Sequence, residues 1–457
     1  MKKNEEYIVD IIDNGYEGEG IAKIDNFTIF IPGAIKGEKL KVVIVKVTSS
    51  FAYGKILEIL EKSTYRVADV DCSTYKRCGG CNLRHINYAK TLELKKNTVQ
   101  NLVNKTLKEK IEVKDTIGME NPFNYRNKAQ YPVGLDKQGN PVIGVFANRT
   151  HEVIEIKECM IQNKESEKIA KYICEFAKEN NISVYNEETR KGLLRHIVIK
   201  VGIKTKEIMC VLVLNGREIN NEGKLVKVLT ERFPSIKTIV KNINMQNTNV
   251  ILGRENINIY GDGYIYDKLG EYTFKISPLS FYQINPIQTE KLYNLALEKA
   301  ELTGREVLFD LYCGIGTIGI FMANKAKEVY GIEIVEQAIE DAKENCKINN
   351  ITNAKYYAGD TEKLLTDLIE NQNIIPDVVV VDPPRKGLDR TTIENIKKIE
   401  AKKVIYISCN PATLVRDLSY LEDKYQVKEI QPVDMFPFSH HIENIAVLNF
   451  KKQQQTY

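Results

Sequence analysis

The stretch EVLFDLYCGIGTIG, residues 306–319, decides the fold because it joins a buried strand to a helix through a glycine-rich turn. Gly314, Gly316 and Gly319 fit the spacing G-x-G-x-x-G, and Glu333 follows 19 residues after Gly314 at the end of the next apolar run. Turns of this kind lie at the carboxyl ends of strands in open parallel sheets, where ligands bind. The stretch therefore predicts an α/β fold with a ligand at this turn.

The whole C-terminal region, residues 276–457, continues the same pattern. Apolar runs such as VYGIEI, DVVVV and KVIYIS alternate with amphipathic stretches such as VEQAIEDAKENCKINN. Continuous apolar strands separated by helices indicate a parallel sheet that is covered on both faces. We predict a doubly wound, Rossmann-like catalytic domain over these residues.

Two further domains are predicted before it, because a single core rarely grows beyond about 250 residues and the chain has 457. Residues 1–61 hold short β-rich runs broken by NGYEGEG and PGAIKGEK, which is typical of a small all-β barrel. Residues 62–275 combine cysteines, the helix-like run YAKTLELKKNTVQNLVNKTL and strands such as LLRHIVIKVG. We interpret them as an α+β middle domain.

The glycine-rich turn and Glu333 fit a nicotinamide dinucleotide and S-adenosyl-L-methionine (SAM) equally well. The run VVVVDPPRKG, residues 378–387, distinguishes between the two candidate cofactors. Its two prolines fix the backbone after the strand and leave Asp382 facing the site. Methyltransferases that act on nucleobases use such an element where base and methyl donor meet, whereas hydride transfer has no evident need for it. The sequence favours SAM.

The run VIYISCNPATL, residues 404–414, ends a buried strand on Cys409. A free cysteine is more often an inert core residue than a catalyst, but the following Asn410 and Pro411 argue against a core strand. Carbon 5 of uracil is too poor a nucleophile to take a methyl group from SAM unaided. A thiolate that adds to carbon 6 makes carbon 5 electron-rich, and a base must then remove the carbon 5 proton. Methylation of a uracil would explain the thiol.

Three further cysteines, Cys72, Cys78 and Cys81, lie close together in DCSTYKRCGGCN. Their spacing indicates a metal site and is closer to that of an iron-sulfur cluster than to the paired knuckles of structural zinc. From spacing alone, the fourth ligand is Cys159 or Cys174. We expect Cys210, Cys313 and Cys346 to be packing residues.

The overall charge of +4 is too small to indicate nucleic-acid binding. Between residues 76 and 110, however, nine Lys or Arg face two acidic residues, Glu93 and Glu109. This excess fits either an RNA backbone or an ordinary solvated helix face. No run is apolar enough for a membrane span and the first residues lack a signal peptide, so we expect a cytoplasmic protein with no membrane contact.

Several motifs together resemble the RNA uracil-5-methyltransferase family over nearly the whole chain. They are DLYCGIGT (310–317), VDPPRKG, ISCNPAT and SHHIEN (439–444), with YRNK (125–128), LRH (194–196) and FYQINP (281–286). The resemblance implies a TRAM domain (OB-like) at residues 1–61 and a 4Fe-4S cluster held by Cys72, Cys78, Cys81 and Cys159. It makes Cys409 the nucleophile and Glu443 the base. The SAM-contacting positions that it implies are Gln283, Tyr312, Thr317, Glu333, Asp360 and Asp382.

The resemblance also bears on the substrate. A TRAM-like barrel combined with four cluster cysteines is more typical of the enzymes that act on 23S ribosomal RNA, so we expect that substrate and a monomeric enzyme. A transfer RNA enzyme and a noncatalytic RNA-binding or assembly factor on the same scaffold are the alternatives. Retention of Cys409, Asp382 and Glu443 together disfavours the noncatalytic protein, and the SCNP context disfavours a cytosine-5 enzyme.

Overall fold

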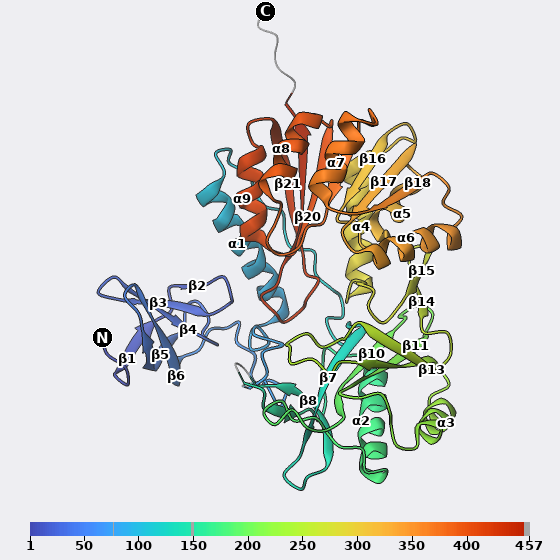
Figure 1. Ribbon diagram of the computed structural model, residues 1–457. Helices are drawn as coiled ribbons and strands as arrows, with labels where there is room; N and C mark the ends of the chain where they lie inside the picture. The colour runs from blue at the N-terminus through green and yellow to red at the C-terminus, as the bar shows by residue number, and fades with distance from the viewer. Residues whose placement is uncertain (76, 148–149, 452–457) are drawn as a thin grey trace, which may run out of the picture.

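The computed structural model describes residues 1–75, 77–147 and 150–451. Figure 1 shows three groups of elements, with an N-terminal β unit beside a central α+β unit and a C-terminal α/β unit. In the described ranges, no helix is long and apolar enough to cross a membrane. Lys76, one of the nine basic residues counted above, lies outside these ranges.

The N-terminal unit is one six-stranded sheet with the strand order β1-β5-β6-β4-β3-β2. The alternating apolar residues of its strands bury a small aliphatic core that includes Val9, Ile29 and Val42. The predicted all-β unit is therefore confirmed. Its strands are β1 (Glu6–Asp10), β2 (Asp13–Asn14), β3 (Gly20–Ile24), β4 (Phe27–Ile31), β5 (Lys39–Val47) and β6 (Phe51–Glu61).

The central unit is a seven-stranded sheet with the order β13-β12-β11-β10-β7-β8-β9. Strands β10 and β11 are buried along their full length, because α2 covers one face and residues such as Val198 and Val211 join the core shared with the C-terminal unit on the other. Its elements are β7 (Lys128–Leu135), β8 (Pro141–Phe146), β9 (Val153–Glu155), α2 (Lys164–Glu179), β10 (Leu194–Val201), β11 (Ile208–Leu214), α3 (Glu222–Arg232), β12 (Ile236–Ile243) and β13 (Glu255–Tyr260).

The C-terminal unit is a mixed sheet with the order β18-β17-β16-β19-β20-β22-β21, in which β18 to β20 run parallel. The prediction of a doubly wound sheet is confirmed. Its elements are α4 (Pro286–Ala300), β16 (Val307–Leu311), α5 (Thr317–Ala323), β17 (Glu328–Glu333), α6 (Glu336–Ile348), β18 (Ala354–Ala358), α7 (Thr361–Glu370), β19 (Val378–Val381), α8 (Arg390–Ile399), β20 (Lys403–Ser408), α9 (Pro411–Leu421), β21 (Tyr425–Val433) and β22 (Glu443–Phe450).

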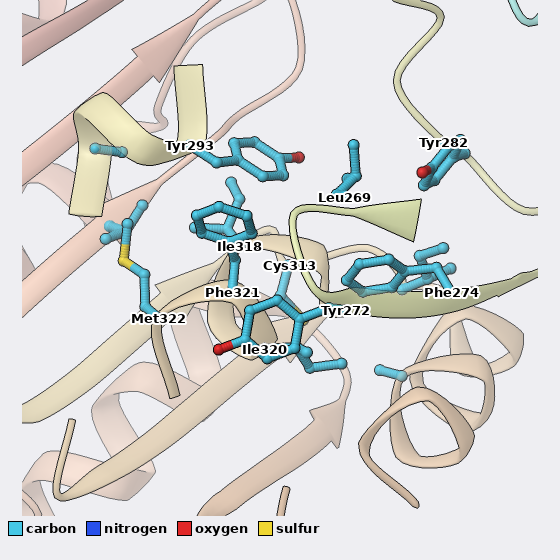
Figure 2. Packing of buried hydrophobic residues seen from close by; sticks show 14 of the residues in the cluster. Leu269, Tyr272, Phe274, Tyr282, Tyr293, Cys313, Ile318, Ile320, Phe321 and Met322 are labelled. Carbon is cyan, nitrogen blue, oxygen red and sulfur yellow. The ribbon is translucent and has the colours of Figure 1, made fainter. Parts of the chain in front are cut away.

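Two separate cores cover the two faces of this sheet. Helices α4, α5 and α6 contribute Leu292, Ile318 and Ile339 to one core, and α7, α8 and α9 contribute to the other. The hairpin β14 (Ile265–Leu269) and β15 (Tyr272–Ile276) closes the first core. In Figure 2 the rings of Tyr272, Tyr293 and Phe321 meet there, with centroids 5.7 and 5.8 Å apart around Phe321. Both faces of the sheet are thereby shielded from water.

Helix α1 (Tyr88–Thr106) packs against α9 of the C-terminal unit. Its residues Val99 and Val103 lie in the same core as Leu414 and Leu418. The sequence-based boundaries 1–61, 62–275 and 276–457 stay a prediction, but this helix belongs by packing to the catalytic sheet and not to the central one.

Candidate active site

The glycine-rich turn after β16 has the backbone that its sequence requires. Tyr312, Gly314 and Gly316 have positive φ angles of 63°, 54° and 77°, and Gly316 precedes the first turn of α5. A Cβ at Gly314 would meet nothing within 4 Å, so the turn is open on its outer side. The Glu333 carboxylate accepts a hydrogen bond from the Gly314 amide at 3.2 Å, which fixes the acid beside the turn.

Asp310 lies under this turn and is fully buried. Its Oδ2 accepts a hydrogen bond from the Gly319 amide at 2.8 Å, whereas its Oδ1 has no hydrogen-bond partner among the described residues. Burial raises the pKa of Asp310 to about 7. The carboxyl group therefore anchors the start of α5 and keeps one polar atom available beneath the turn.

The parallel register brings the predicted cofactor residues to one edge of the sheet. Leu311 pairs with Ile332 on one side and with Val381 on the other, so Tyr312 lies between Glu333, the last residue of β17, and Asp382, which directly follows β19. Burial raises the pKa of Asp382 to about 7. An acid, an open glycine turn and a second acid in a row suit a ligand that carries both ribose hydroxyls and a positive charge, as SAM does.

The other predicted cofactor residues are placed as follows. Thr317 begins α5 and its hydroxyl lies 3.0 Å from the Tyr293 hydroxyl. Gln283 lies in the linker before α4, where its carbonyl accepts a hydrogen bond from the Asn127 amide at 2.9 Å. Asp360 is exposed and caps α7 by accepting from the amides of that helix's first turn. Asp360 thus has a structural task at the end of β18, independent of any cofactor.

Cys409 and Glu443 face each other across neighbouring strands. Ser408, the last residue of β20, pairs with Asn444 of the antiparallel strand β22, so Cys409 and Glu443 lie next to each other at the strand ends, and the Glu443 charge acts on the Cys409 thiol. Cys409 is half-buried, and Glu443 is 2% exposed. This pairing joins segments that the sequence separates by more than thirty residues.

The electrostatic surroundings of these two groups are unfavourable to negative charge. Burial, followed by the charges of Glu443 and Asp382, raises the pKa of Cys409 to about 11, and the Arg385 guanidinium opposes the rise. Burial and the neighbouring Asp382 raise the pKa of Glu443 well above its usual range. Strongly perturbed groups that converge in this way are typical of active sites.

The four predicted cluster cysteines differ from Cys174 in their exposure. Cys72, Cys78, Cys81 and Cys159 are free and partly exposed, and Cys174 is buried inside α2. Cys81 and Cys159 contact the same small apolar group around Tyr125 and Phe438. Their donor chemistry fits an iron-sulfur cluster, but among the residues that the structure describes no group of three or more His, Cys, Asp or Glu side chains is positioned to hold a metal ion.

The basic run around α1 is largely paired with acids of the same chain. Lys95, one of the nine basic residues of this run, is buried against Asp434, with Nζ to Oδ1 at 2.6 Å. Other members of the run also form ion pairs: Arg77 with Glu152, Arg84 with Asp71, Lys90 with Glu93 and Lys96 with Asp115. The run therefore offers RNA less free positive charge than its composition indicates.

Sequence reasoning missed two residues at this site. Arg385 follows the Asp-Pro-Pro element, and its carbonyl accepts hydrogen bonds from Asn410 Nδ2 at 3.0 Å and Thr413 Oγ1 at 3.2 Å, which tie the two active-site loops together. Tyr16 comes from the loop between β2 and β3 of the N-terminal unit and donates a hydrogen bond to Asn410 Oδ1 at 3.3 Å. The motif DPPR contained a signal for Arg385, but no local pattern pointed to Tyr16.

A doubly wound sheet with this turn and this row of acids defines an enzyme that binds a nucleoside-containing cofactor such as SAM at the carboxyl ends of its strands. Comparison with known families narrows the class. The family model described as tRNA (uracil-5-)-methyltransferase matches residues 87–451, and the TRAM domain model matches residues 2–57. The chain belongs to the tRNA (uracil-5-)-methyltransferase family, and it is an RNA uracil-5-methyltransferase that uses SAM and carries a TRAM domain.

Individual relatives agree over nearly the full length. A protein named as an uncharacterized RNA methyltransferase of Clostridium acetobutylicum is 48% identical, and the match covers 98% of each chain. One of Staphylococcus aureus is 45% identical over 99% of each chain. Among solved structures, the tRNA (uracil-54, C5)-methyltransferase of Pyrococcus abyssi in complex with S-adenosyl-L-homocysteine is similar with a TM-score of 0.78 and 26% identity, and the match covers 97% of this chain and 100% of that one.

Proposed function

We propose that the enzyme methylates uracil through a covalent intermediate in which Cys409 is bonded to carbon 6 of the base. The observation that supports this proposal is the pairing of Ser408 with Asn444, which brings Cys409 next to Glu443 in the backbone register at the cofactor edge of the sheet. A nucleophile next to a base is the arrangement that such chemistry needs.

In the proposed sequence of steps, the Cys409 thiolate adds to carbon 6 and carbon 5 becomes an enolate carbon. Carbon 5 would then take the methyl group of SAM held at the turn, as the sulfur–methyl bond breaks and S-adenosyl-L-homocysteine is left. The Glu443 carboxylate then removes the carbon 5 proton, the carbon 5–carbon 6 double bond re-forms, and the thiolate leaves. Arg385 assists the first step because its charge lowers the pKa of Cys409. The raised pKa of Glu443 makes its carboxylate a stronger base once ionised.

The residues described at the turn fit the cofactor. We propose that Glu333 binds the ribose hydroxyls, that Asp382 and Tyr312 line the site between sugar and base, and that Thr317 and Gln283 complete it. Support comes from the fixed position of Glu333 against the Gly314 amide and from the open space beside Gly314. Asp360 is the predicted contact with least support, since its carboxylate already caps α7.

RNA that contains 5-fluorouridine tests the covalent step, because fluorine on carbon 5 cannot leave as a proton and the adduct persists. Wild-type protein should form a covalent complex that survives denaturing electrophoresis, and Cys409→Ala should form none while still binding SAM. Cys346→Ala, which changes a buried cysteine of α6, is the matched control and should form the adduct normally. Adduct formation by Cys409→Ala would assign the nucleophile to another residue.

Glu443→Gln separates the two halves of the reaction. Because the amide cannot accept the carbon 5 proton, methyl transfer should proceed and the methylated adduct should accumulate on natural RNA. Turnover at the wild-type rate would remove Glu443 from the proposed mechanism.

We infer that the substrate is 23S ribosomal RNA, as the TRAM domain and the four cysteines favour. The similar archaeal structure is named for uracil-54 of transfer RNA, which makes transfer RNA the second candidate. Deletion of the gene, followed by mass spectrometry of 5-methyluridine in separated RNA fractions, decides between them. Loss confined to transfer RNA would overturn the ribosomal assignment and leave the chemistry intact.

We also propose that Cys72, Cys78, Cys81 and Cys159 hold a 4Fe-4S cluster. Support comes from their free thiols and from the common apolar group that Cys81 and Cys159 contact. Protein purified without oxygen should contain about four irons per chain, as four thiolates on one cluster require. Stoichiometric zinc without iron would refute the cluster, and full iron retention in Cys159→Ala would exclude Cys159 as the fourth ligand.

A further inference from the structure

The loop between β2 and β3 of the TRAM domain reaches the active site. Its residue Tyr16 donates a hydrogen bond to Asn410, the residue directly after Cys409, across 394 positions of sequence. The Tyr16 ring lies 6.1 Å from the His440 ring, with the two planes tilted by 56°. An aromatic side chain of an RNA-binding domain therefore forms part of the rim around the proposed nucleophile.

Hydrogen bonds and a close contact within the chain hold this loop in position. The Asn14 amide donates hydrogen bonds to the carbonyl groups of Gly18, Glu19 and Ala34, at 3.5, 3.4 and 3.1 Å. Gly18 has a φ of +86°, and a Cβ there would lie 2.3 Å from Leu83 Cδ2. The loop thus rests closely on Leu83 and places Tyr16 without help from the substrate.

The segment below the loop is connected to the active site as well. The Leu83 amide donates to the Phe438 carbonyl at 2.9 Å, and the His440 amide donates to Asn82 Oδ1 at 2.9 Å. The TRAM loop, the residues around Leu83 and the segment that leads to Glu443 therefore form one continuous rim.

A cavity of about 200 Å³ opens behind this rim, between the TRAM loop and α1. Its walls combine the Tyr16 and His440 rings with Asn97 and with Lys36 and Lys90, which are paired with Asp13 and Glu93 of the same lining. Tyr16 is 41% exposed, so its ring is available to a ligand. Rings beside lysine and amide side chains are the components with which proteins bind unstacked nucleotides.

Methylation of carbon 5 needs the target base out of its stack, which leaves the adjacent nucleotides without a stacking partner. We propose that Tyr16 is a substrate-binding residue that stacks on a nucleotide adjacent to the target uridine, with that nucleotide entering the cavity behind the rim. The inference rests on the proposed role of Cys409, since it takes the thiol as the place where the target base lies.

Steady-state kinetics of Tyr16→Ala and Tyr16→Phe test this proposal on full-length protein. Transcribed 23S ribosomal RNA and transfer RNA are first tested as substrates of the wild type with tritiated SAM. The RNA that is methylated then serves as the probe. Loss of one stacked base should raise KM for RNA about fivefold to a hundredfold in Tyr16→Ala, the equivalent of about 1–3 kcal/mol. The value of kcat and the KM for SAM should stay at the wild-type level, and Tyr16→Phe should behave as wild type because it keeps the ring.

Tyr260→Ala, which removes a tyrosine of 40% exposure on the edge strand β13, is the matched control and should leave KM for RNA unchanged. Equal damage by Tyr16→Phe and Tyr16→Ala would overturn the proposal and assign the effect to the hydrogen bond with Asn410. An unchanged KM in Tyr16→Ala would overturn it too. If one of these results overturns the proposal while the variant still forms the 5-fluorouridine adduct, only the role of Tyr16 is refuted and the covalent mechanism stands.

Discussion

Replacing Lys95 by methionine should destabilise the protein strongly, because Lys95 forms a buried ion pair that joins α1 to the segment before β22. Its Nζ donates to Asp434 Oδ1 at 2.6 Å, to the Phe436 carbonyl at 3.2 Å and to the His441 carbonyl at 2.8 Å. The two charged side chains are 2% and 0% exposed. Lys95→Met keeps the length and apolar character of the side chain and removes only the charge and its three hydrogen bonds.

The structure sets the expected size of the effect. Removing one partner of a buried ion pair costs about 3–5 kcal/mol, because the remaining charge stays buried without compensation. Tyr88 still donates a hydrogen bond to Asp434 Oδ2 at 2.8 Å, so we expect a loss near the lower end, about 3 kcal/mol. The double variant Lys95→Met/Asp434→Asn buries no charge at this place and should recover part of that loss.

Urea unfolding followed by far-ultraviolet circular dichroism measures the free energy of unfolding of each variant. Lys96→Met is the matched control: its pair with Asp115 is exposed, with side chains 25% and 93% accessible, and such pairs contribute about 0–1 kcal/mol. Equal losses in the two single variants, or a loss below about 1 kcal/mol in Lys95→Met, would refute the buried-pair reasoning.

Three further outcomes are expected. The pKa of Asp310 is raised to about 7 in the folded protein, so between about pH 4 and pH 7 the folded protein keeps a proton that the unfolded chain releases, and the free energy of unfolding should fall as pH rises. Asp310→Asn should reduce that slope in urea titrations. Gly316→Ala should weaken SAM binding in calorimetry, because φ is +77° and the new Cβ would lie 2.9 Å from the Tyr356 hydroxyl. Arg385→Gln should slow alkylation of Cys409 by iodoacetamide, about tenfold for each unit by which the thiol pKa rises.

Each of these three predictions has a control variant or a result that would contradict it. An identical pH slope in wild type and Asp310→Asn would contradict the first. Gly304→Ala has a similar φ of +90° but open space around its Cβ, and it should leave SAM binding unchanged. Lys386→Gln removes a cation next to Arg385 and should not alter the alkylation rate, so equal slowing in both variants would contradict the assignment to Arg385.

Local patterns predicted the catalytic sheet well, for a physical reason. A strand that is buried on both faces must be apolar throughout, and a turn with positive φ angles favours glycine, so residues 306–319 carry their conformation in their own composition. The place of Cys409 could be predicted in the same way, because Asn-Pro ends an apolar run and β20 ends at Ser408, one residue before the thiol; its role as nucleophile stays a proposal. These features need no knowledge of distant residues.

The environment of each charge could not be predicted in this way. The basic run around α1 fitted either an RNA-facing surface or a solvated helix face, yet Lys95 is buried against Asp434, 339 positions away. Whether a lysine meets RNA or an internal carboxylate depends on which helix face packs against the sheet, and residues from the far end of the chain decide that.

The sequence by itself determined the doubly wound domain and the all-β N-terminal unit, since each depends on neighbours within a few turns or strands. Only the tertiary structure decided that Ser408 pairs with Asn444, that Arg385 lies close enough to act on Cys409, and that Tyr16 of the first domain reaches Asn410. Such contacts arise when separate segments bury apolar surface together, and burial of that kind is a property of the assembled chain and not of any short stretch of it.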